Sequence, residues 1–156
     1  MKPRNFLVLV IVAGLAASLL DRGGQAQLTL PGGKDDTLSR LGQRVGGFLE
    51  EIANDNVDEA VEQFLVRSPL LKDAARVARL KESIQRVSQQ YGAFLKVEPV
   101  QLERAGRSLV RAVYLYECDD YPIVWSITFY RPDDEGDWSV ISLQFHLDYD
   151  RVPTTP

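Results

Sequence analysis

The sequence holds a single cysteine, Cys118, and a single histidine, His146, among its 156 residues. One cysteine excludes an internal disulfide, and one cysteine with one histidine gives no metal-ligand spacing. We therefore predict neither a metal site nor a cofactor. Cys118 ends a strand-like run ahead of a turn, which favours a buried structural cysteine over an intermolecular disulfide or a catalytic thiol.

Catalytic signatures and basic charge are also scarce. The sequence has no glycine-rich phosphate loop and no nucleophile elbow. Its carboxylates Asp119, Asp120 and Asp133 to Asp137 fall in predicted turns, where a general base rarely reaches the proton that it must remove. The formal net charge is −4, and binding to nucleic acid needs a concentrated basic surface. These absences favour a non-enzymatic protein that does not bind nucleic acid.

The apolar run at residues 6–20 is shorter than the roughly 20 residues that a membrane-spanning helix needs. Lys2 and Arg4 precede this run, and Gly24-Gln25-Ala26 offers small residues to a signal peptidase. Residues 1–26 are therefore predicted to be a secretory signal peptide, and an uncleaved N-terminal anchor is the alternative. In both cases we expect an exported protein, periplasmic or secreted, that is held at a membrane only if the segment is retained.

One domain is predicted at residues 37–149, after a linker at 27–36 and before a flexible tail at 150–156. Apolar residues at helical spacing predict three helices, at about 37–54, 57–66 and 71–91. From Phe94 the period changes to two and predicts four strands, at 94–103, 107–118, 123–131 and 138–149. Short loops make sequential strands antiparallel neighbours. The predicted fold is α+β, with three N-terminal helices packed on a curved four-stranded antiparallel meander.

Two features of the predicted helices have alternative interpretations. Gly46-Gly47 interrupts the first helix, and we interpret it as a close packing contact, with a functional groove as the alternative. The third helix carries a basic face that is predicted to be solvated surface rather than an anion site, because acidic residues interrupt it. Its members are Lys72, Arg76, Arg79, Lys81 and Arg86.

Tight hairpins would pair residue 104 with 107, 118 with 123, and 131 with 138. Alternation then places the predicted ligand-binding residues together on one face: Tyr114, Tyr116, Trp125, Ser142, Gln144 and His146. The opposite face receives Leu102, Leu143 and Phe145. The alternative is a one-residue slip at the long third turn, which would exchange the faces of the last strand alone. Both faces are too apolar for open water, and only three helices are available to cover them, so we expect a homodimer through the sheet.

The six predicted ligand-binding residues combine aromatic rings with a polar ladder, as small-molecule pockets do. The alternatives are that the aromatic rings form core or interface, and that His146 is a half-exposed histidine near a strand end. The turn DDEGD at residues 133–137 lacks the ligand spacing of a calcium loop and is predicted to be solvated.

The "YGAF" passage at Tyr91 to Phe94 and the "GDWSVISLQFH" strand at Gly136 to His146 follow three predicted helices and join a meander. In this order of elements the chain resembles the nuclear-transport-factor-2-like (cystatin-like α+β) superfamily, and in particular small bacterial exported domains of unknown function. The resemblance implies a pocket between a concave sheet and the helices, and dimerisation through the sheet. Some members are isomerases or dehydratases that use an Asp, or a His–Asp pair, with Tyr, and many others are binding or assembly modules.

We therefore expect an exported, non-enzymatic binding or assembly domain. It would hold a small hydrophobic ligand or a protein partner in the cleft between helices and sheet, or on the sheet face. No catalytic residue is assigned in this hypothesis. The alternative is a lyase or isomerase acting on a small hydrophobic substrate, with His146 as the base and Tyr114 or Tyr116 polarising the substrate.

Overall fold

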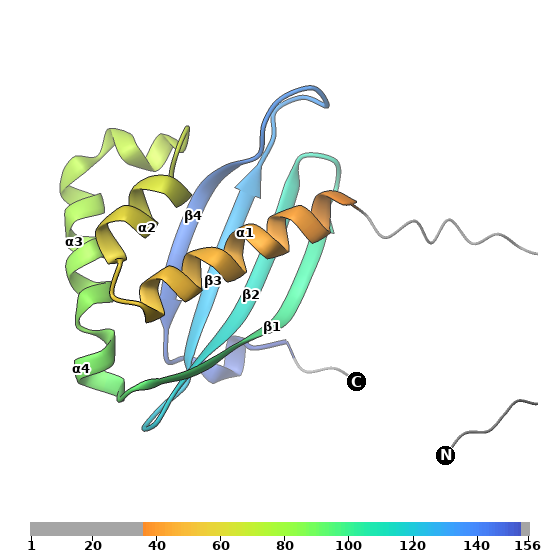
Figure 1. Cartoon of the computed structure of the whole chain (residues 1–156). Coiled ribbons are helices and arrows are strands. Elements are labelled where there is room, and N and C mark those ends of the chain that lie inside the picture. Colours follow the sequence, from red (N-terminus) through yellow and green to blue (C-terminus); the bar gives the residue numbers. More distant parts are fainter. Residues whose placement is uncertain (1–35, 154–156) are drawn as a thin grey trace, which may run out of the picture. The chain divides into compact units, whose positions relative to one another are not determined.

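The computed structural model of the chain describes residues 36–153 (Figure 1). Residues 1–35 and 154–156 lie outside the described residues, and with them the predicted signal peptide, nearly all of the linker and the end of the tail. Within residues 36–153 the helices come first and a four-stranded antiparallel sheet follows. The predicted α+β class is confirmed.

The first two helices form as their apolar spacing predicts. Helix α1 (Asp36–Ala53) buries one apolar side, and α2 (Val57–Phe64) follows after a short turn in which Asp55 has a positive φ of 63°. The rings of Phe48 and Phe64 stack with centroids 4.1 Å apart, which holds the two helices together. The buried side of α1 consists of Leu41, Val45, Phe48, Leu49 and Ile52.

The predicted third helix at 71–91 is wrong as a single element. It consists of a 3-10 turn, η1 (Pro69–Lys72), followed by α3 (Ala74–Gln85) and α4 (Val87–Tyr91). The side chain of Asp73 accepts a hydrogen bond from the backbone N–H of Arg76 at 2.9 Å and so begins α3 as an N-cap. Apolar spacing alone does not show where α3 begins, whereas the N-cap residue Asp73 does.

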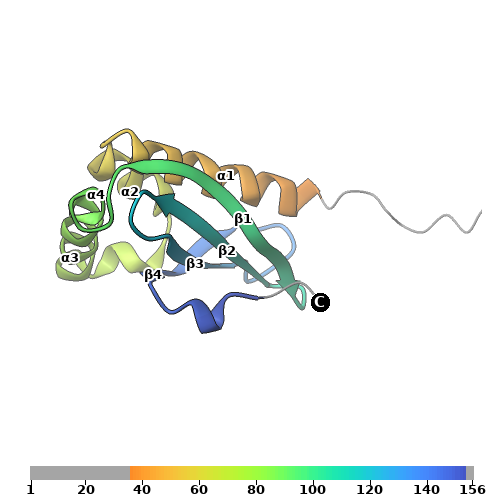
Figure 2. The ribbon, with the colours of Figure 1, turned by 90° about the horizontal axis from the view of Figure 1, so that it is seen from below.

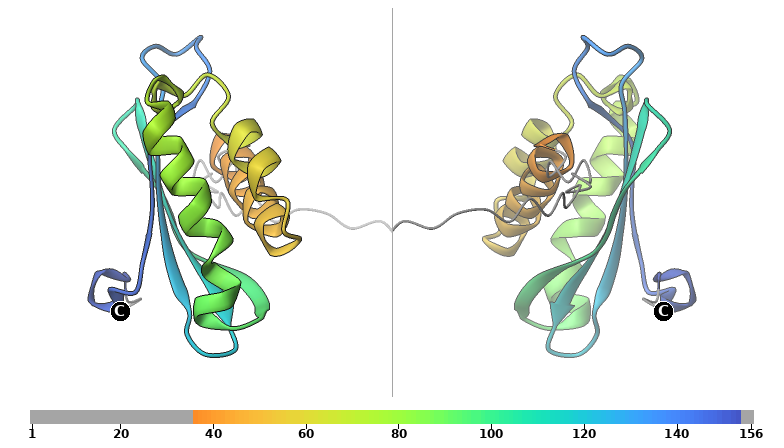
Figure 3. Two further views of the ribbon diagram at one scale, coloured as in Figure 1. Left: turned by 90° about the vertical axis from the view of Figure 1, so that its left-hand side faces the viewer. Right: turned by 90° about the vertical axis from the view of Figure 1, so that its right-hand side faces the viewer.

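The four strands form a meander in the order β1-β2-β3-β4. They are β1 (Phe94–Ala105), β2 (Leu109–Cys118), β3 (Ile123–Tyr130) and β4 (Ser139–His146). Figure 2 shows the long, bent β1 beside α1. Helices α1 and α2 cover one face of the sheet, which we call the inner face, and the segment after β4 lies on the opposite side, the outer face (Figure 3).

The predicted faces of β2 and β3 are confirmed. Tyr114 pairs with Trp125 and Val110 with Phe129, and these side chains lie in the core under the helices. The inner face of the two strands comprises Val110, Ala112, Tyr114, Tyr116, Cys118, Ile123, Trp125, Ile127 and Phe129. The predicted pairing of residue 118 with 123 is wrong, since Tyr116 pairs with Ile123, but a shift of two residues leaves every side chain on its predicted face.

Several face assignments in the edge strands β1 and β4 are wrong. Thr128 pairs with Ser142 but Phe129 pairs with Val140, so Ile141 is an extra residue in β4. Beyond this bulge the faces exchange: Leu143 and Phe145 turn to the core, and Ser142, Gln144 and His146 to the outer face. In β1 the error arises at the turn: Arg104 pairs with Val110 instead of residue 107, so Leu102 pairs with Ala112 and lies on the inner face.

The chain after β4 turns back along the outer face. The Tyr149 hydroxyl donates a hydrogen bond to the carbonyl of Pro122 at 2.8 Å, and residues Tyr149–Arg151 form a short 3-10 turn, η2. Val113 and Val124 are buried although they belong to the outer face. The predicted tail therefore begins within a 3-10 turn, and Tyr149 just before it is hydrogen-bonded to the β2–β3 loop.

The interpretation of Gly46-Gly47 as a packing contact is wrong. A Cβ atom added to either glycine would have no neighbour within 4 Å. The close approach is instead at Gly42, where an added Cβ would lie 3.1 Å from Leu102 Cδ2 and 3.4 Å from the Tyr114 hydroxyl. The same hydroxyl donates a hydrogen bond to the Gly42 carbonyl at 3.2 Å.

We expect Gly47→Ala to raise the free energy of unfolding by up to about 1 kcal/mol, because alanine is the better helix former and nothing obstructs its methyl group. Gly42→Ala is the matched variant in the same helix. Its methyl group needs Leu102 to shift by a few tenths of an ångström, which offsets the gain in helix propensity, so Gly42→Ala is expected to be less stable than Gly47→Ala. Urea denaturation followed by far-UV circular dichroism measures both. Equal stabilisation by the two substitutions would contradict the packing at Gly42.

Candidate functional site

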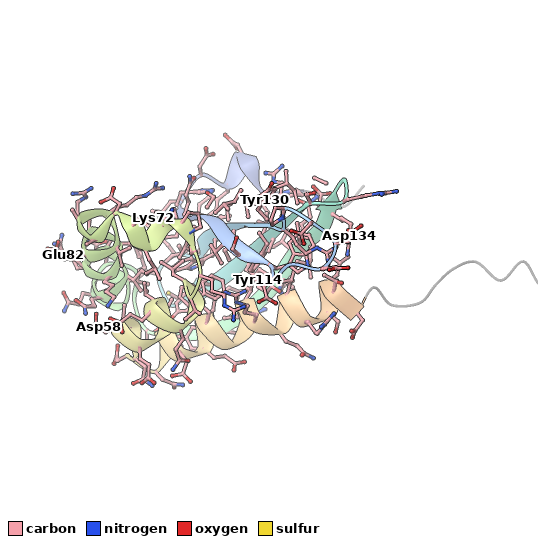
Figure 4. The ribbon with its side chains drawn as sticks, turned by 90° about the horizontal axis from the view of Figure 1, so that it is seen from above. Asp58, Lys72, Glu82, Tyr114, Tyr130 and Asp134 are labelled. Carbon is pink, nitrogen blue, oxygen red and sulfur yellow. The ribbon has the colours of Figure 1, made fainter. Side chains whose placement is uncertain are left out.

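The aromatic half of the predicted ligand-binding set lies in the core. Tyr114, Tyr116 and Trp125 are 5%, 4% and 0% exposed. The Trp125 ring contacts Phe48 edge-on at 5.6 Å between centroids and Phe145 at 4.9 Å. Burial raises the pKa of both Tyr114 and Tyr116, so their phenols stay protonated. These rings fill the interior, as the alternative interpretation proposes. Figure 4 shows Tyr114 beside α1.

The polar half lies on the outer face, separated from the aromatic half by the sheet itself. Ser142, Gln144 and His146 face the same side as Ser126 and line a small polar cavity of about 190 Å³. The structure does not bring the six residues together. The predicted common face is wrong because of the bulge at Ile141.

Both ring nitrogens of His146 have neighbours on the outer face. Its Nδ1 accepts a hydrogen bond from the Asp148 backbone N–H at 3.2 Å, and its Nε2 lies 3.5 Å from Ser126 Oγ. Tyr114 and Tyr116 lie on the other side of the sheet. The arrangement that the lyase or isomerase alternative requires is therefore not formed.

Cys118 is buried, as predicted for a structural cysteine. Burial raises the pKa of its thiol, and the neighbouring carboxylates of Asp119 and Asp120 raise it further. A nucleophilic cysteine needs the opposite shift, because the thiolate is the reactive form. The thiol of Cys118 is therefore a poor nucleophile in the folded protein.

A cavity of about 590 Å³ opens where the beginning of α1, the end of α2 and the β3–β4 loop meet. We call it the arginine cleft, after Arg40, Arg44, Arg67 and Arg131 in its wall. Figure 4 shows Asp134 on the loop at this end of the domain. The other lining residues are Thr37, Leu41, Gln63, Val66, Gly136, Asp137 and Trp138.

Arg44 is the half-buried cation of the cleft. Its guanidinium donates hydrogen bonds to the carbonyl of Trp138 at 3.0 Å and to that of Phe64 at 2.6 Å. It also lies over the rings of Phe64 and Phe129, at 5.3 and 5.6 Å from their centroids. Burial lowers the pKa of Arg44, but an arginine side chain keeps its charge in proteins. Within residues 36–153 no carboxylate forms an ion pair with it.

The ring of Trp138 lies close to two guanidinium groups. The guanidinium carbons of Arg131 and Arg104 lie 5.0 and 5.7 Å from the centre of its ring. Arg131 also contacts Asp134, through the backbone carbonyl and the carboxylate at 3.1 Å each. Its Nε is buried and has no hydrogen-bond partner among the described residues. Trp138 and Arg131 therefore pack together in the wall of the cleft, and Arg131 Nε is left as an unpaired donor among the described residues.

The remaining cleft arginines have exposed ion-pair partners. Arg67 pairs with Asp137, and both side chains are 71% exposed. Arg40 pairs with Asp36 at 3.2 Å, one helical turn away. Exposed pairs of this kind contribute about 0–1 kcal/mol each. The carboxylates are therefore readily exchanged for another anion.

Sequence reasoning missed this cleft because its residues come from three distant segments. One signal was present at Arg44, which follows Leu41 by three residues and precedes Phe48 by four. Those intervals place an arginine on the apolar stripe of the helix. A charged residue in that position has to find hydrogen-bond acceptors inside the fold.

Among residues 36–153, no group of three or more His, Cys, Asp or Glu side chains is placed to hold a metal ion. No helix of this part of the chain is both long and apolar enough to cross a bilayer. In comparisons with known proteins, the chain matches no family profile, no curated protein and no solved structure.

Proposed function

We propose that the domain is a non-enzymatic binding module whose arginine cleft holds an anionic group of its ligand. The observation that carries this proposal is Arg44, a half-buried cation without a carboxylate partner among the described residues, in the wall of a 590 Å³ cleft. The protein has a net negative charge of −4, so a local gathering of four arginines is not explained by composition.

The chemistry of the cleft favours a carboxylate or a phosphate. A guanidinium donates two parallel hydrogen bonds to either group, and Arg67 and Arg131 both line the cleft. The aspartates that now contact these arginines are exposed and bind weakly. Trp138 adds an aromatic surface for an apolar part of the ligand. The hydrophobic ligand predicted from the sequence therefore gains an acidic group in this proposal.

Three further proposals come from the sequence and its resemblance. They are export by residues 1–26, membership of the nuclear-transport-factor-2-like superfamily, and a homodimer through the sheet. Each is independent of the arginine cleft. The homodimer was predicted because both faces of the sheet are too apolar for open water. On the outer face, Val113 and Val124 are already buried within one chain, so this part of the face needs no second copy to cover it.

The test is calorimetric titration of the purified chain with citrate and with pyrophosphate at low ionic strength. We expect one of these anions to bind, and the double variant Arg40→Gln, Arg67→Gln to weaken binding by about tenfold or more, since a charge-assisted hydrogen bond contributes about 1.5–3 kcal/mol. Neither substitution removes Arg44, which holds the fold together.

Arg107→Gln is the matched control, because Arg107 is an exposed arginine in the β1–β2 turn, outside the cleft. It should leave the binding constant unchanged. The proposal fails if neither anion binds to the parent protein, or if the control loses as much affinity as the double variant. Binding should also weaken as salt is added.

A further inference from the structure

Strand β4 is an edge of the sheet, and beyond its bulge at Ile141 it carries none of the usual protection against further pairing. It lies last in the order β1-β2-β3-β4 and reads SVISLQFH, without proline or a formally charged residue. Edge strands of soluble proteins are normally blunted by charge, proline or bulges, because their unpaired backbone groups accept another strand. The opposite edge, β1, follows this rule with Lys96, Glu98, Pro99 and two irregularities in pairing.

The first part of β4 has an outside partner, and the second part is open. The Ser68 hydroxyl donates a hydrogen bond to the carbonyl of Val140, which ties η1 to the beginning of the strand. From Leu143 to His146 the only backbone partner among the described residues is β3. The backbone groups that point away from β3 in this half are therefore available for another strand.

A groove of about 530 Å³ runs beside this open half, between β4 and α3. The helix lies alongside the β4 edge in two perpendicular views (Figures 1 and 3). Helix α3 contributes Arg76, Arg79, Leu80 and Ser83, and the strand side contributes Gln144, Phe145, His146 and Asp148. A groove between an open strand edge and a helix is the site where extended peptides bind by strand addition.

The helix side of this groove is basic. Arg76 and Arg79 are exposed, lie one turn apart on α3, and form no ion pair within residues 36–153. They belong to the basic face that the sequence predicts to be solvated surface. The half-buried Leu80 on α3 and Phe145 on β4 also line the groove and make part of its wall apolar.

We propose that an extended acidic segment of a partner protein binds in this groove and pairs with the second half of β4. Its backbone adds a strand to the sheet, its acidic side chains meet Arg76 and Arg79, and its apolar side chains meet Leu80 and Phe145. The partner is an extended segment rather than a folded second copy. A second copy pairing edge to edge would bring its own α3, with the same two arginines, against this one. The proposal does not depend on the arginine cleft, because the two sites share no residue.

The test uses short fluorescein-labelled peptides titrated into the purified chain, with fluorescence anisotropy as the readout. The acidic probe alternates glutamate with valine, a basic counterpart alternates lysine with valine, and a third peptide carries a central proline in the acidic sequence. We expect the acidic probe to bind at least tenfold more tightly than the basic one. Proline should also weaken binding, because it removes a donor from the added strand.

Protein variants and hydrogen exchange locate the bound peptide. Arg76→Glu with Arg79→Glu should weaken the acidic probe by at least tenfold and strengthen the basic one, while Arg107→Glu, an exposed charge reversal elsewhere, should change neither. Both α3 positions are exposed, so the fold is retained and amide chemical-shift dispersion checks it. The bound acidic probe should slow exchange of the outward backbone amides between Leu143 and His146.

Failure of the acidic probe to bind, equal loss in the Arg107 variant, or unchanged exchange in β4 would each overturn the proposal. So would protection of the same amides by self-association of the chain without peptide, detected by sedimentation, since a second copy would then occupy the edge. None of these outcomes bears on anion binding at the arginine cleft, so failure here and failure of the proposed function are told apart.

Discussion

Trp125→Ala is expected to lower the free energy of unfolding by about 3–5 kcal/mol, the usual range for removing a large buried aromatic side chain. The ring is fully buried at the centre of the inner face. It contacts Phe48 on α1 and Phe145 beyond the bulge in β4. Its loss therefore leaves a cavity bounded by two separate layers, which cannot both move in to fill it. Urea denaturation followed by far-UV circular dichroism measures the change.

Trp125→Phe and Trp138→Ala complete the experiment. The indole N–H of Trp125 is buried without a hydrogen-bond partner among the described residues. Phenylalanine removes this unsatisfied donor and keeps most of the ring volume, so a smaller loss than for alanine is expected. Trp138 is only half-buried at the rim of the arginine cleft, and its truncation should also cost less than that of Trp125. A loss below about 1 kcal/mol for Trp125→Ala would contradict its central position.

The effect predicted for Trp125 depends on a face assignment that the sequence makes correctly in part of the sheet. Alternation places Trp125 with Tyr114 and Phe129 because β2 and β3 pair without interruption. Only the partner across β4 is wrong. Simple continuation of the hairpin register puts Gln144 beside Trp125 on the inner face, whereas the structure puts Phe145 there.

Energetics explains why the bulge wins over regular pairing in β4. Without the extra residue at Ile141, Leu143 and Phe145 would face outward while Ser142 and Gln144 entered the core. Burying one large apolar side chain contributes about 1.5–3 kcal/mol, and a polar side chain in the core has to find a partner. The alternation of apolar and polar residues from Leu143 to His146 indicates the correct faces. Extending the pairing from the turn at 131 and 138 gives the opposite faces.

The candidate site is less accessible to sequence reasoning than the fold. Periodicity identifies helices and strands, because it reports which side of one element is buried. The arginine cleft instead joins Arg44, Arg67 and Arg131, which are distant in sequence and meet only after α1, α2 and the β3–β4 loop have packed. The same holds for the groove beside β4. Its wall joins the basic face of α3 to an edge strand that comes about 60 residues later in the sequence, and only the folded structure brings the two together.

Arg44→Met is expected to lower the free energy of unfolding by about 2–4 kcal/mol. Methionine keeps the apolar stem but removes the donors to the carbonyls of Phe64 and Trp138. Each part-buried acceptor left without a partner costs about 1–3 kcal/mol, and the contacts with the Phe64 and Phe129 rings are lost as well. Arg44→Lys keeps the charge but cannot reproduce the planar fork, so an intermediate loss is expected.

Arg40→Met is the matched control, since it makes the same replacement one turn earlier in α1. Arg40 is exposed and its ion pair with Asp36 is a surface pair, so its removal should change the free energy of unfolding by about 0.5 kcal/mol or less. Chemical denaturation of the three variants, with the parent protein alongside, decides the point. Equal losses in the Arg44 and Arg40 variants would mean that Arg44 does not join α1 to α2 and the loop. A loss confined to Arg44 would establish that the cleft is built around a structural cation, so that ligand binding has to be tested at Arg40 and Arg67 instead.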